Sequence, residues 1–175
     1  LRWSYAASKM IDVFIALSLY EEKKVSPIIV RLFNIIGPNQ LSKFGMVVPR
    51  FIGAAINDED ILIHGDGSQS RSFTWVDDVV TYLIKLAELK AYGEIFNIGQ
   101  TEEITIKELA ELIIEKSNSN SKIIYKSHEE VFGKSFEDPN RRTPGIEKIV
   151  EFTGIKPSEN IEFMIENIIN HKQNN

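Results

Sequence analysis

The chain has 175 residues and a formal net charge of −5, and 43% of its residues are hydrophobic, which is enough for a packed core and excludes wholesale disorder. The negative charge disfavours non-specific nucleic-acid binding, and the absence of cysteine excludes disulfides, zinc fingers and a thiolate nucleophile. No apolar run approaches the roughly 20 residues that span a bilayer, so we expect a cytoplasmic protein that binds neither nucleic acid nor membrane.

Helices and strands alternate along the sequence. Apolar residues recur at helical spacing from Trp3 to about Lys23, and the apolar, β-branched run from Pro27 to Asn34 predicts a buried strand. The alternation predicts a parallel or mixed α/β sheet. By the same criteria we expect further helices over about 44–56, 77–90, 105–116, 144–152 and 158–170, and further strands over 61–64, 70–76, 94–98 and 122–126.

Three groups of polar residues bear on helix capping and on metal binding. Thr105 and Glu108 stand in capping-box register. Asp77 and Asp78 are adjacent, so on a helix they point in different directions, and we interpret them as capping residues rather than paired catalytic carboxylates. The three histidines fall on different elements without an acidic partner at ligand spacing, so we predict no metal site; they are His64, His128 and His171.

The first candidate for chemistry is Tyr5-Ala-Ala-Ser-Lys9. Residues four apart share one face of a helix, and a lysine ammonium close to a phenol stabilises the phenolate. Such a tyrosine can act as a general base or acid near neutral pH. The spacing alone is weak evidence, because Tyr20 and Lys24 show it too, and an exposed amphipathic pair explains it equally well.

Five blocks together resemble the extended short-chain dehydrogenases, which form the NAD-dependent epimerase/dehydratase family. The run Arg-Trp-Ser-Tyr-Ala-Ala-Ser-Lys closely resembles the active-site helix of that family. The resemblance extends from Arg2 to about Ile169 and is closest to nucleotide-sugar enzymes of the UDP-glucose 4-epimerase kind. The other four blocks follow in the family's order at residues 30–38, 45–51, 65–78 and 96–99.

The resemblance implies roles for individual residues. Tyr5 matches the catalytic tyrosine, which takes a proton from a sugar hydroxyl while hydride passes to NAD, and Lys9 matches the lysine that holds the nicotinamide ribose. Asn34 matches an asparagine that contacts the substrate diphosphate, although a strand-end asparagine capping the Gly37-Pro38 turn would look the same.

Three further positions match substrate-binding residues of the family. Arg71 matches an arginine that grips the diphosphate, which suits a guanidinium, although an ion pair with the aspartates at 77–78 is an alternative. Arg142 resembles a second diphosphate or ribose contact, with the choice between Arg141 and Arg142 left open. Val48 lies with Met46 where the family packs near the nucleobase, and plain helix core is an equal alternative.

The implied fold combines the C-terminal part of a Rossmann-type doubly wound sheet with a small α/β substrate-binding domain. We expect residues 1–40 to end the NAD-binding domain and residues 41–175 to bind the sugar nucleotide, with strand 94–98 as a candidate to return to the main sheet. The chain has no Gly-x-Gly-x-x-Gly turn and so no dinucleotide phosphate site of its own. We therefore expect a C-terminal segment of a longer enzyme, inactive alone.

Three reactions share this half of the family's fold. The wording of the blocks favours a UDP-sugar 4-epimerase, which oxidises C4 and then reduces the ketone again. A 4,6-dehydratase and a UDP-glucuronate decarboxylase are alternatives, and an inactive sugar-nucleotide-binding module is an alternative of another class. The resemblance also implies a homodimer through the tyrosine helix, with Phe14, Leu17 and Tyr20 on the shared face or, equally, in the core.

Overall fold

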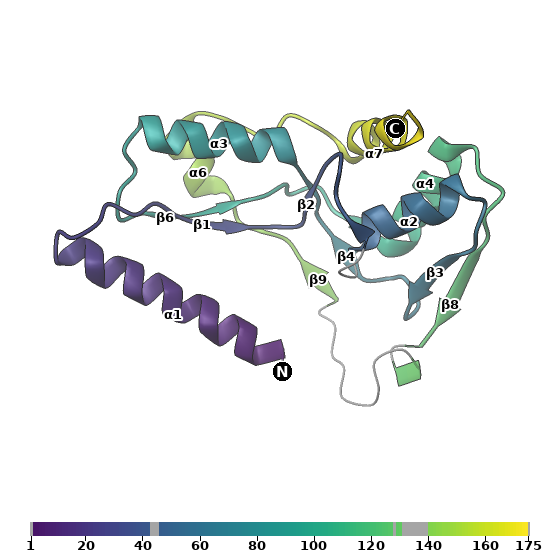
Figure 1. Cartoon of the computed structure of the whole chain (residues 1–175), viewed down its shortest axis with the longest axis horizontal. Helices are drawn as coiled ribbons and strands as arrows, with labels where there is room; N and C mark the ends of the chain where they lie inside the picture. Colours follow the sequence, from purple (N-terminus) through teal and green to yellow (C-terminus); the bar gives the residue numbers. More distant parts are fainter. Residues whose placement is uncertain (1, 43–45, 128, 131–139, 175) are drawn as a thin grey trace.

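We describe the chain from a computed structural model, which covers residues 2–42, 46–127, 129–130 and 140–174 (Figure 1). Helices and short strands alternate in a mixed α/β fold, as the sequence pattern predicted. The helices are α1 (Arg2–Glu21), α2 (Val47–Ile56), α3 (Val76–Glu88), α4 (Ile106–Ser117), α6 (Glu147–Thr153) and α7 (Ile161–Gln173). The strands are β1 (Ile29–Leu32), β2 (Ile35–Ile36), β3 (Ile61–His64), β4 (Ser70–Arg71), β5 (Thr74–Trp75), β6 (Ile95–Ile98), β7 (Ile104–Thr105), β8 (Ile123–Lys126) and β9 (Arg141–Arg142).

Most strand pairs are parallel and join segments far apart in the sequence. β1 pairs with β6, β2 with β5 and β3 with β8, each in parallel. Parallel neighbours need a crossover connection, and α3 and α4 lie in the crossovers of the first and third pair. β4 is the central strand of a three-stranded sheet, antiparallel to β7 and parallel to β9.

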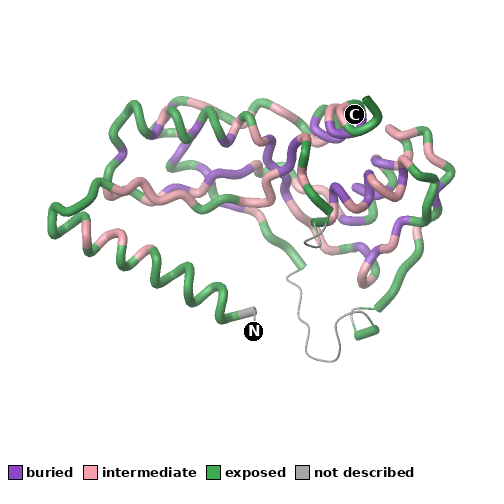
Figure 2. The backbone as a smooth tube through the Cα atoms, in the orientation of Figure 1, coloured by how far each residue is buried: buried purple, intermediate pink, exposed green. Residues whose placement is uncertain are grey.

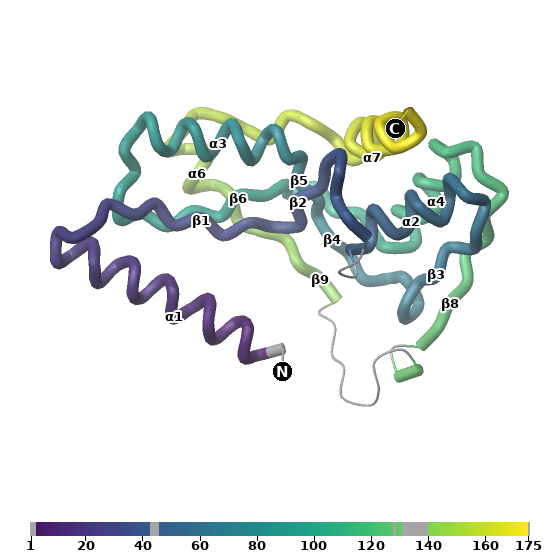
Figure 3. The backbone as a smooth tube through the Cα atoms, in the orientation of Figure 1, coloured from purple at the N-terminus to yellow at the C-terminus, as the bar shows by residue number. Residues whose placement is uncertain are grey.

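Two hydrophobic cores hold these elements together, and Figure 2 shows buried segments at both ends of the molecule. The first core packs α2, α4 and α7 against β3, with Phe51, Ile63 and Met164 among its fully buried side chains. The second core packs α3 and α6 against β1 and β6, around Tyr82 and Phe96. The segment from β4 to β5 runs between the two ends of the molecule in Figure 3, and its Phe73 and Trp75 belong to the first core.

Helix α1 belongs to neither core. It runs beneath β1 and β6 in Figure 1, and Figure 2 shows it mostly exposed, with intermediate burial in places along its C-terminal half. Its apolar side chains lie open, with Trp3 78% exposed and Phe14 64% exposed. At its C-terminal end the Tyr20 ring covers Gly93, where a Cβ atom would overlap the ring. No helix in the described ranges is both long and apolar enough to cross a lipid bilayer.

The structure corrects two local expectations. The strand expected over 70–76 is two strands, because β4 pairs with β7 and β9 whereas β5 pairs with β2. The helix-capping interpretation of Asp77 and Asp78 is wrong, since neither side chain caps α3. Asp77 accepts from the Trp75 indole N–H at 3.1 Å, and Asp78 accepts from the Ser158 hydroxyl at 2.7 Å. Both carboxylates nevertheless lie in the first turn of α3, where negative charge is favourable.

The predicted capping box at the start of α4 is confirmed. Thr105 Oγ1 accepts from the Glu108 backbone N–H at 3.1 Å, and the Glu108 carboxylate accepts from the Thr105 backbone N–H at 2.9 Å. Two N–H groups that the helix itself cannot satisfy are thereby paired. Because α4 packs in the first core, this start also fixes where β7 ends.

We predict that Thr105→Ala lowers the free energy of unfolding by about 0.5–2 kcal/mol, because an N-terminal N–H of α4 loses its acceptor. Urea unfolding of the purified protein measures the change. Thr101→Ala is the matched control, since Thr101 is exposed and lies outside the helix. Equal effects of the two substitutions would show that the capping bond contributes nothing measurable.

Candidate functional site

Tyr5 and Lys9 lie one turn apart on the same face of α1. The Tyr5 side chain is 68% exposed, so its phenol is open to a ligand. The Lys9 ammonium donates to the Asp12 carboxylate at 2.9 Å, and this hydrogen bond together with the charge of Asp12 raises the pKa of Lys9. The helix therefore presents an exposed phenol next to a firmly protonated ammonium.

The second tyrosine–lysine pair has the same spacing but a different environment. The Tyr20 ring packs over Gly93, so it joins α1 to the segment between α3 and β6. Lys24 lies beyond the end of α1, and its ammonium pairs with Glu22 at 2.6 Å. Only the Tyr5–Lys9 pair is placed on a continuous helical face.

Arg71 and Arg142 are brought to one face of the small sheet by strand register. β4 and β9 pair in parallel, with Arg71 opposite Arg142 and Ser70 opposite Arg141. Paired residues of neighbouring strands point to the same side of a sheet, and consecutive residues point to opposite sides. Arg71 also donates to the Ser70 carbonyl at 2.6 Å. The register thus places Arg142, not Arg141, beside Arg71.

A carboxylate that the sequence analysis did not identify binds on the opposite face. Glu103, just before β7, accepts from Arg141 Nε at 2.8 Å and from the Ser70 hydroxyl at 2.7 Å, and also pairs with Arg141 Nη2. These bonds, led by the one to Arg141, lower the pKa of Glu103 to about 2. The partners are 38 and 33 residues away in the chain, so no local pattern could reveal the cluster.

Asn34 binds the backbone of the segment that follows Arg71. Its backbone has a φ of +38°, a conformation that asparagine tolerates better than most residues. Its side-chain amide donates to the Ser72 carbonyl at 2.8 Å, and its own carbonyl accepts from the Thr74 N–H at 3.1 Å. The alternative of a cap on the Gly37-Pro38 turn is therefore wrong, because the Asn34 amide reaches the segment after Arg71 instead.

Val48 lies in the first hydrophobic core and is only 1% exposed. This burial favours the core interpretation over a nucleobase contact. Met46, two residues earlier, is 47% exposed and is the side chain in this stretch that a ligand could reach. Substrate contact at this position stays a prediction.

The histidines do not form a metal site in the part of the chain that the structure covers. His64 Nε2 lies 3.4 Å from Arg50 Nη1, and His171 Nε2 lies 3.0 Å from the Asn39 side-chain oxygen. His128 is outside the described residues. Among the described residues, no group of three or more histidine, aspartate or glutamate side chains is placed to hold a metal ion.

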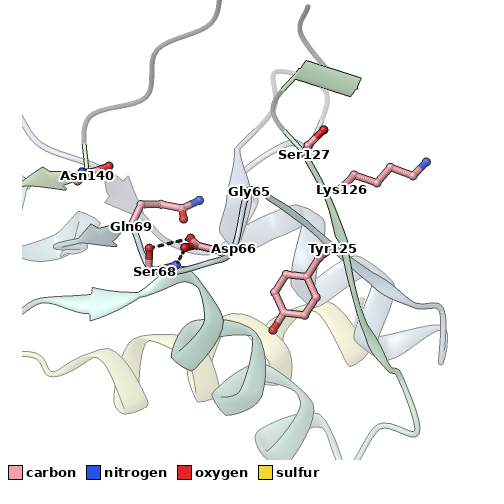
Figure 4. A pocket seen from close by; sticks show the side chains of 8 residues that line it. All are labelled: Gly65, Asp66, Ser68, Gln69, Tyr125, Lys126, Ser127 and Asn140. Carbon is pink, nitrogen blue, oxygen red and sulfur yellow. Dashed lines mark hydrogen bonds between the residues drawn. The ribbon is translucent and has the colours of Figure 1, made fainter.

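An open polar groove of about 950 Å³ adjoins the arginine sheet. It lies between the loop before β4 and the end of β8, as Figure 4 shows. Asp66 accepts from the Ser68 N–H at 2.9 Å and from the Ser68 hydroxyl at 2.7 Å, which fixes the loop. Gln69 and Asn140 directly precede β4 and β9, so the groove reaches the strands that carry the arginines.

Comparison with known proteins places the chain in a family. The family model described as NAD dependent epimerase/dehydratase matches residues 1–99, which is more than half of the chain. The chain belongs to the NAD-dependent epimerase/dehydratase family. The description of this family names NAD as its cofactor.

Curated relatives of the chain include several decarboxylases. The chain is 38% identical over 159 residues to a UDP-N-acetyl-alpha-D-glucosaminuronate decarboxylase of Bacillus cytotoxicus, covering 90% of this chain and 49% of that protein. It is 37% identical over 129 residues to UDP-glucuronic acid decarboxylase 4 of Arabidopsis thaliana, covering 74% of this chain and 28% of that protein. The chain thus spans half the length of these relatives or less.

Solved structures share the fold. A UDP-N-acetylglucosamine 4-epimerase from Methanobrevibacter ruminantium, in complex with UDP-N-acetylmuramic acid, matches with a TM-score of 0.85 at 27% identity, covering 97% of this chain and 53% of that one. A UDP-glucose 4-epimerase from Thermotoga maritima, with UDP-glucose, matches with a TM-score of 0.82 at 25% identity, covering 97% and 52%. The fold is the Rossmann-like fold of this superfamily.

We predict that Glu103→Gln destabilises the protein at neutral pH and that this difference disappears in acid. A carboxylate whose pKa is lowered to about 2 stabilises the fold fully above its ordinary value of 4.5 and loses that contribution as the pH falls toward 2. Urea unfolding of both proteins between pH 7 and pH 2 measures the difference. A difference that stays constant over this range would contradict the Glu103–Arg141 pairing.

Proposed function

We propose that the natural full-length gene product uses NAD to oxidise a UDP-sugar at C4, and that these 175 residues supply the proton-transfer pair and much of the sugar-nucleotide site. The observation that carries this proposal is that one chain of this family presents two groups of suitable side chains. One group is the Tyr5 phenol beside Lys9, and the other is Arg71 beside Arg142.

Tyr5 is the proposed proton acceptor. Its phenolate oxygen takes the proton of the C4 hydroxyl as the C4–H bond breaks and the C4–O bond becomes a carbonyl. When bound, NAD supplies the acceptor for the hydride that leaves C4. The Lys9 ammonium, held charged by Asp12, favours the phenolate form of Tyr5 and offers donors to ribose hydroxyls.

The residues of this chain fit one end of NAD. Tyr5 and Lys9 are exposed and offer hydroxyl and ammonium groups, which suit the ribose of the nicotinamide nucleoside. The pyrophosphate needs backbone N–H groups at a glycine-rich turn, and the sequence of these 175 residues has no such turn. The phosphate end of the cofactor therefore needs groups that this chain does not provide.

Arg71 and Arg142 are the proposed diphosphate ligands. A guanidinium binds phosphate oxygens through paired N–H donors, so two of them on one sheet face match a diphosphate. Asn34 holds the backbone after Arg71 through its side-chain N–H, and we propose that its side-chain oxygen orients a ligand or water. The polar groove along Gln69 and Asn140 offers amides and hydroxyls for the remainder of the nucleotide sugar.

Decarboxylation of a UDP-hexuronate is the leading proposal for the fate of the ketone. The curated relatives at 37–38% identity are decarboxylases of UDP-sugar acids. Oxidation of a hexuronate at C4 places the ketone β to the C6 carboxylate, and such a keto acid loses CO₂ readily. The second candidate is 4-epimerisation. The residues of the sequence blocks favour it, and two of the similar solved structures are 4-epimerases by name.

A product assay tests the proposal. We expect the purified full-length gene product, supplied with NAD and UDP-glucuronate, to release one CO₂ for each UDP-pentose formed, as followed by ¹³C NMR and mass spectrometry. Formation of UDP-galacturonate without CO₂ would assign the enzyme as an epimerase instead. If neither UDP-glucuronate, UDP-N-acetylglucosaminuronate nor UDP-glucose is converted, C4 oxidation of a UDP-sugar is wrong.

We predict that Tyr5→Phe lowers turnover by about 10²–10⁴-fold, the range typical of losing a general acid or base. The affinity for UDP should stay within about twofold, because Tyr5 lies on α1 and the proposed diphosphate ligands lie on β4 and β9. Tyr20→Phe is the matched control and should leave turnover unchanged. A Tyr5→Phe protein with wild-type turnover would remove Tyr5 from the mechanism.

A further inference from the structure

The sheet β7–β4–β9 divides its charged residues between two faces. In the register of the sheet, Arg71 lies opposite Ile104 of β7 and Arg142 of β9, whereas Ser70 lies opposite Thr105 and Arg141. Because side chains alternate along a strand, Arg71 and Arg142 share one face. Glu103 precedes Ile104, and its bonds to Ser70 and Arg141 show that it lies on the other face.

Strand β9 is paired to β4 over a short backbone ladder. It is a two-residue edge strand, and its backbone pairing to β4 includes the Ser70 N–H bond to the Asn140 carbonyl at 2.9 Å. So short a strand is weakly fixed by its ladder alone. The paired hydrogen bonds from Arg141 to Glu103 add a second attachment, and the charge on both partners makes them stronger than neutral bonds.

The same ion pair makes Arg141 differ from Arg142, because only Arg141 has its charge neutralised by Glu103. Glu103 neutralises Arg141, and its side chain is only 24% exposed, against 74% for Arg141. Among the residues that the structure describes, no carboxylate lies within ion-pair distance of Arg142. An anion that approaches this sheet therefore meets the positive charge of Arg142 rather than that of Arg141.

We propose that Glu103 is a positioning residue that binds Arg141 and Ser70 on one face of the sheet and thereby holds Arg142 beside Arg71 on the other face, where both bind a nucleoside diphosphate. This inference rests on the proposed function, since it names the residue that sets up the diphosphate site. Glu103 itself does not touch the ligand. Glu103 acts indirectly: by holding Arg141 it keeps β9 in register with β4, and this register sets the position of Arg142.

The test compares two ligands that differ only in the diphosphate. Dissociation constants of UDP and of uridine are measured on the full-length gene product by NMR titration. We expect Glu103→Gln to weaken UDP binding by about tenfold, because a lost charge-assisted bond loosens β9. Uridine binding should stay within about twofold, because uridine lacks the diphosphate that Arg142 is proposed to bind.

Two control variants bracket this effect. Glu102→Gln removes the neighbouring carboxylate, which is exposed, and should leave both dissociation constants unchanged. Arg71→Ala removes a proposed diphosphate ligand directly and should weaken UDP binding at least as much as Glu103→Gln. Together they show whether the loss follows from the particular position of Glu103 rather than from the change in net charge.

Arg141→Gln tests the same link from the other partner. We expect it to weaken UDP binding as much as Glu103→Gln does, and the double variant to lose no more than either single variant. A much larger loss in Arg141→Gln would show that Arg141 itself binds the diphosphate, which overturns the positioning role. An unchanged UDP affinity in Glu103→Gln, or equal losses for UDP and uridine, would overturn it as well.

The failure of the proposed function would look different. A wild-type protein that binds neither UDP nor a UDP-sugar would overturn the proposed function, and this inference with it. Wild-type UDP binding that every Glu103 and Arg141 variant retains would overturn this inference alone.

Discussion

The pairing of β4 with strands on both of its sides is the constraint on which the candidate site depends. β4 has only two residues, yet it pairs with two strands. One is β7, directly before α4, and the other is β9, about 70 residues further along the chain than β4. Its register decides which arginine stands beside Arg71 and which faces Glu103. A shift by one residue would exchange the two faces, because side chains alternate along each strand.

Helix α1 differs from the other elements of the chain, because it packs in neither hydrophobic core. Two cores fix most of the strands and the helices α2, α3, α4, α6 and α7, whereas α1 lies outside both and exposes apolar side chains. A contiguous exposed apolar surface of this kind commonly marks a protein interface. The homodimer that the family resemblance implies stays a prediction, with Phe14 on the exposed side of α1 and Tyr20 already engaged by Gly93.

The roles proposed for Tyr5, Lys9, Arg71 and Arg142 belong to steps that several reactions of the family share. Proton transfer at C4 and binding of a diphosphate are common to epimerases, dehydratases and decarboxylases, so Tyr5, Lys9, Arg71 and Arg142 do not distinguish among them. The distinction depends on how the ketone is handled after oxidation. The preference for decarboxylation rests on the names of the curated relatives. The geometry of the sheet does not contribute to it.

The sequence predicted the features that depend on neighbours a few residues away. Periodicity predicted α1 and the strand at 61–64, and the capping box of Thr105 and Glu108 was legible because its two residues are three apart. The motif blocks also sufficed to identify the family. Each of these signals lies within a short window, where backbone preference and side-chain spacing largely decide the outcome.

Only the tertiary structure decided the contacts between distant segments. Asp78 binds Ser158 80 residues away instead of capping α3, and Glu103 reaches Arg141 across 38 residues. Arg141 and Arg142 look alike in the sequence, and the register of β9 against β4 separates them. Such choices follow from which strands pair and on which face a side chain emerges, and neither is encoded in the local pattern.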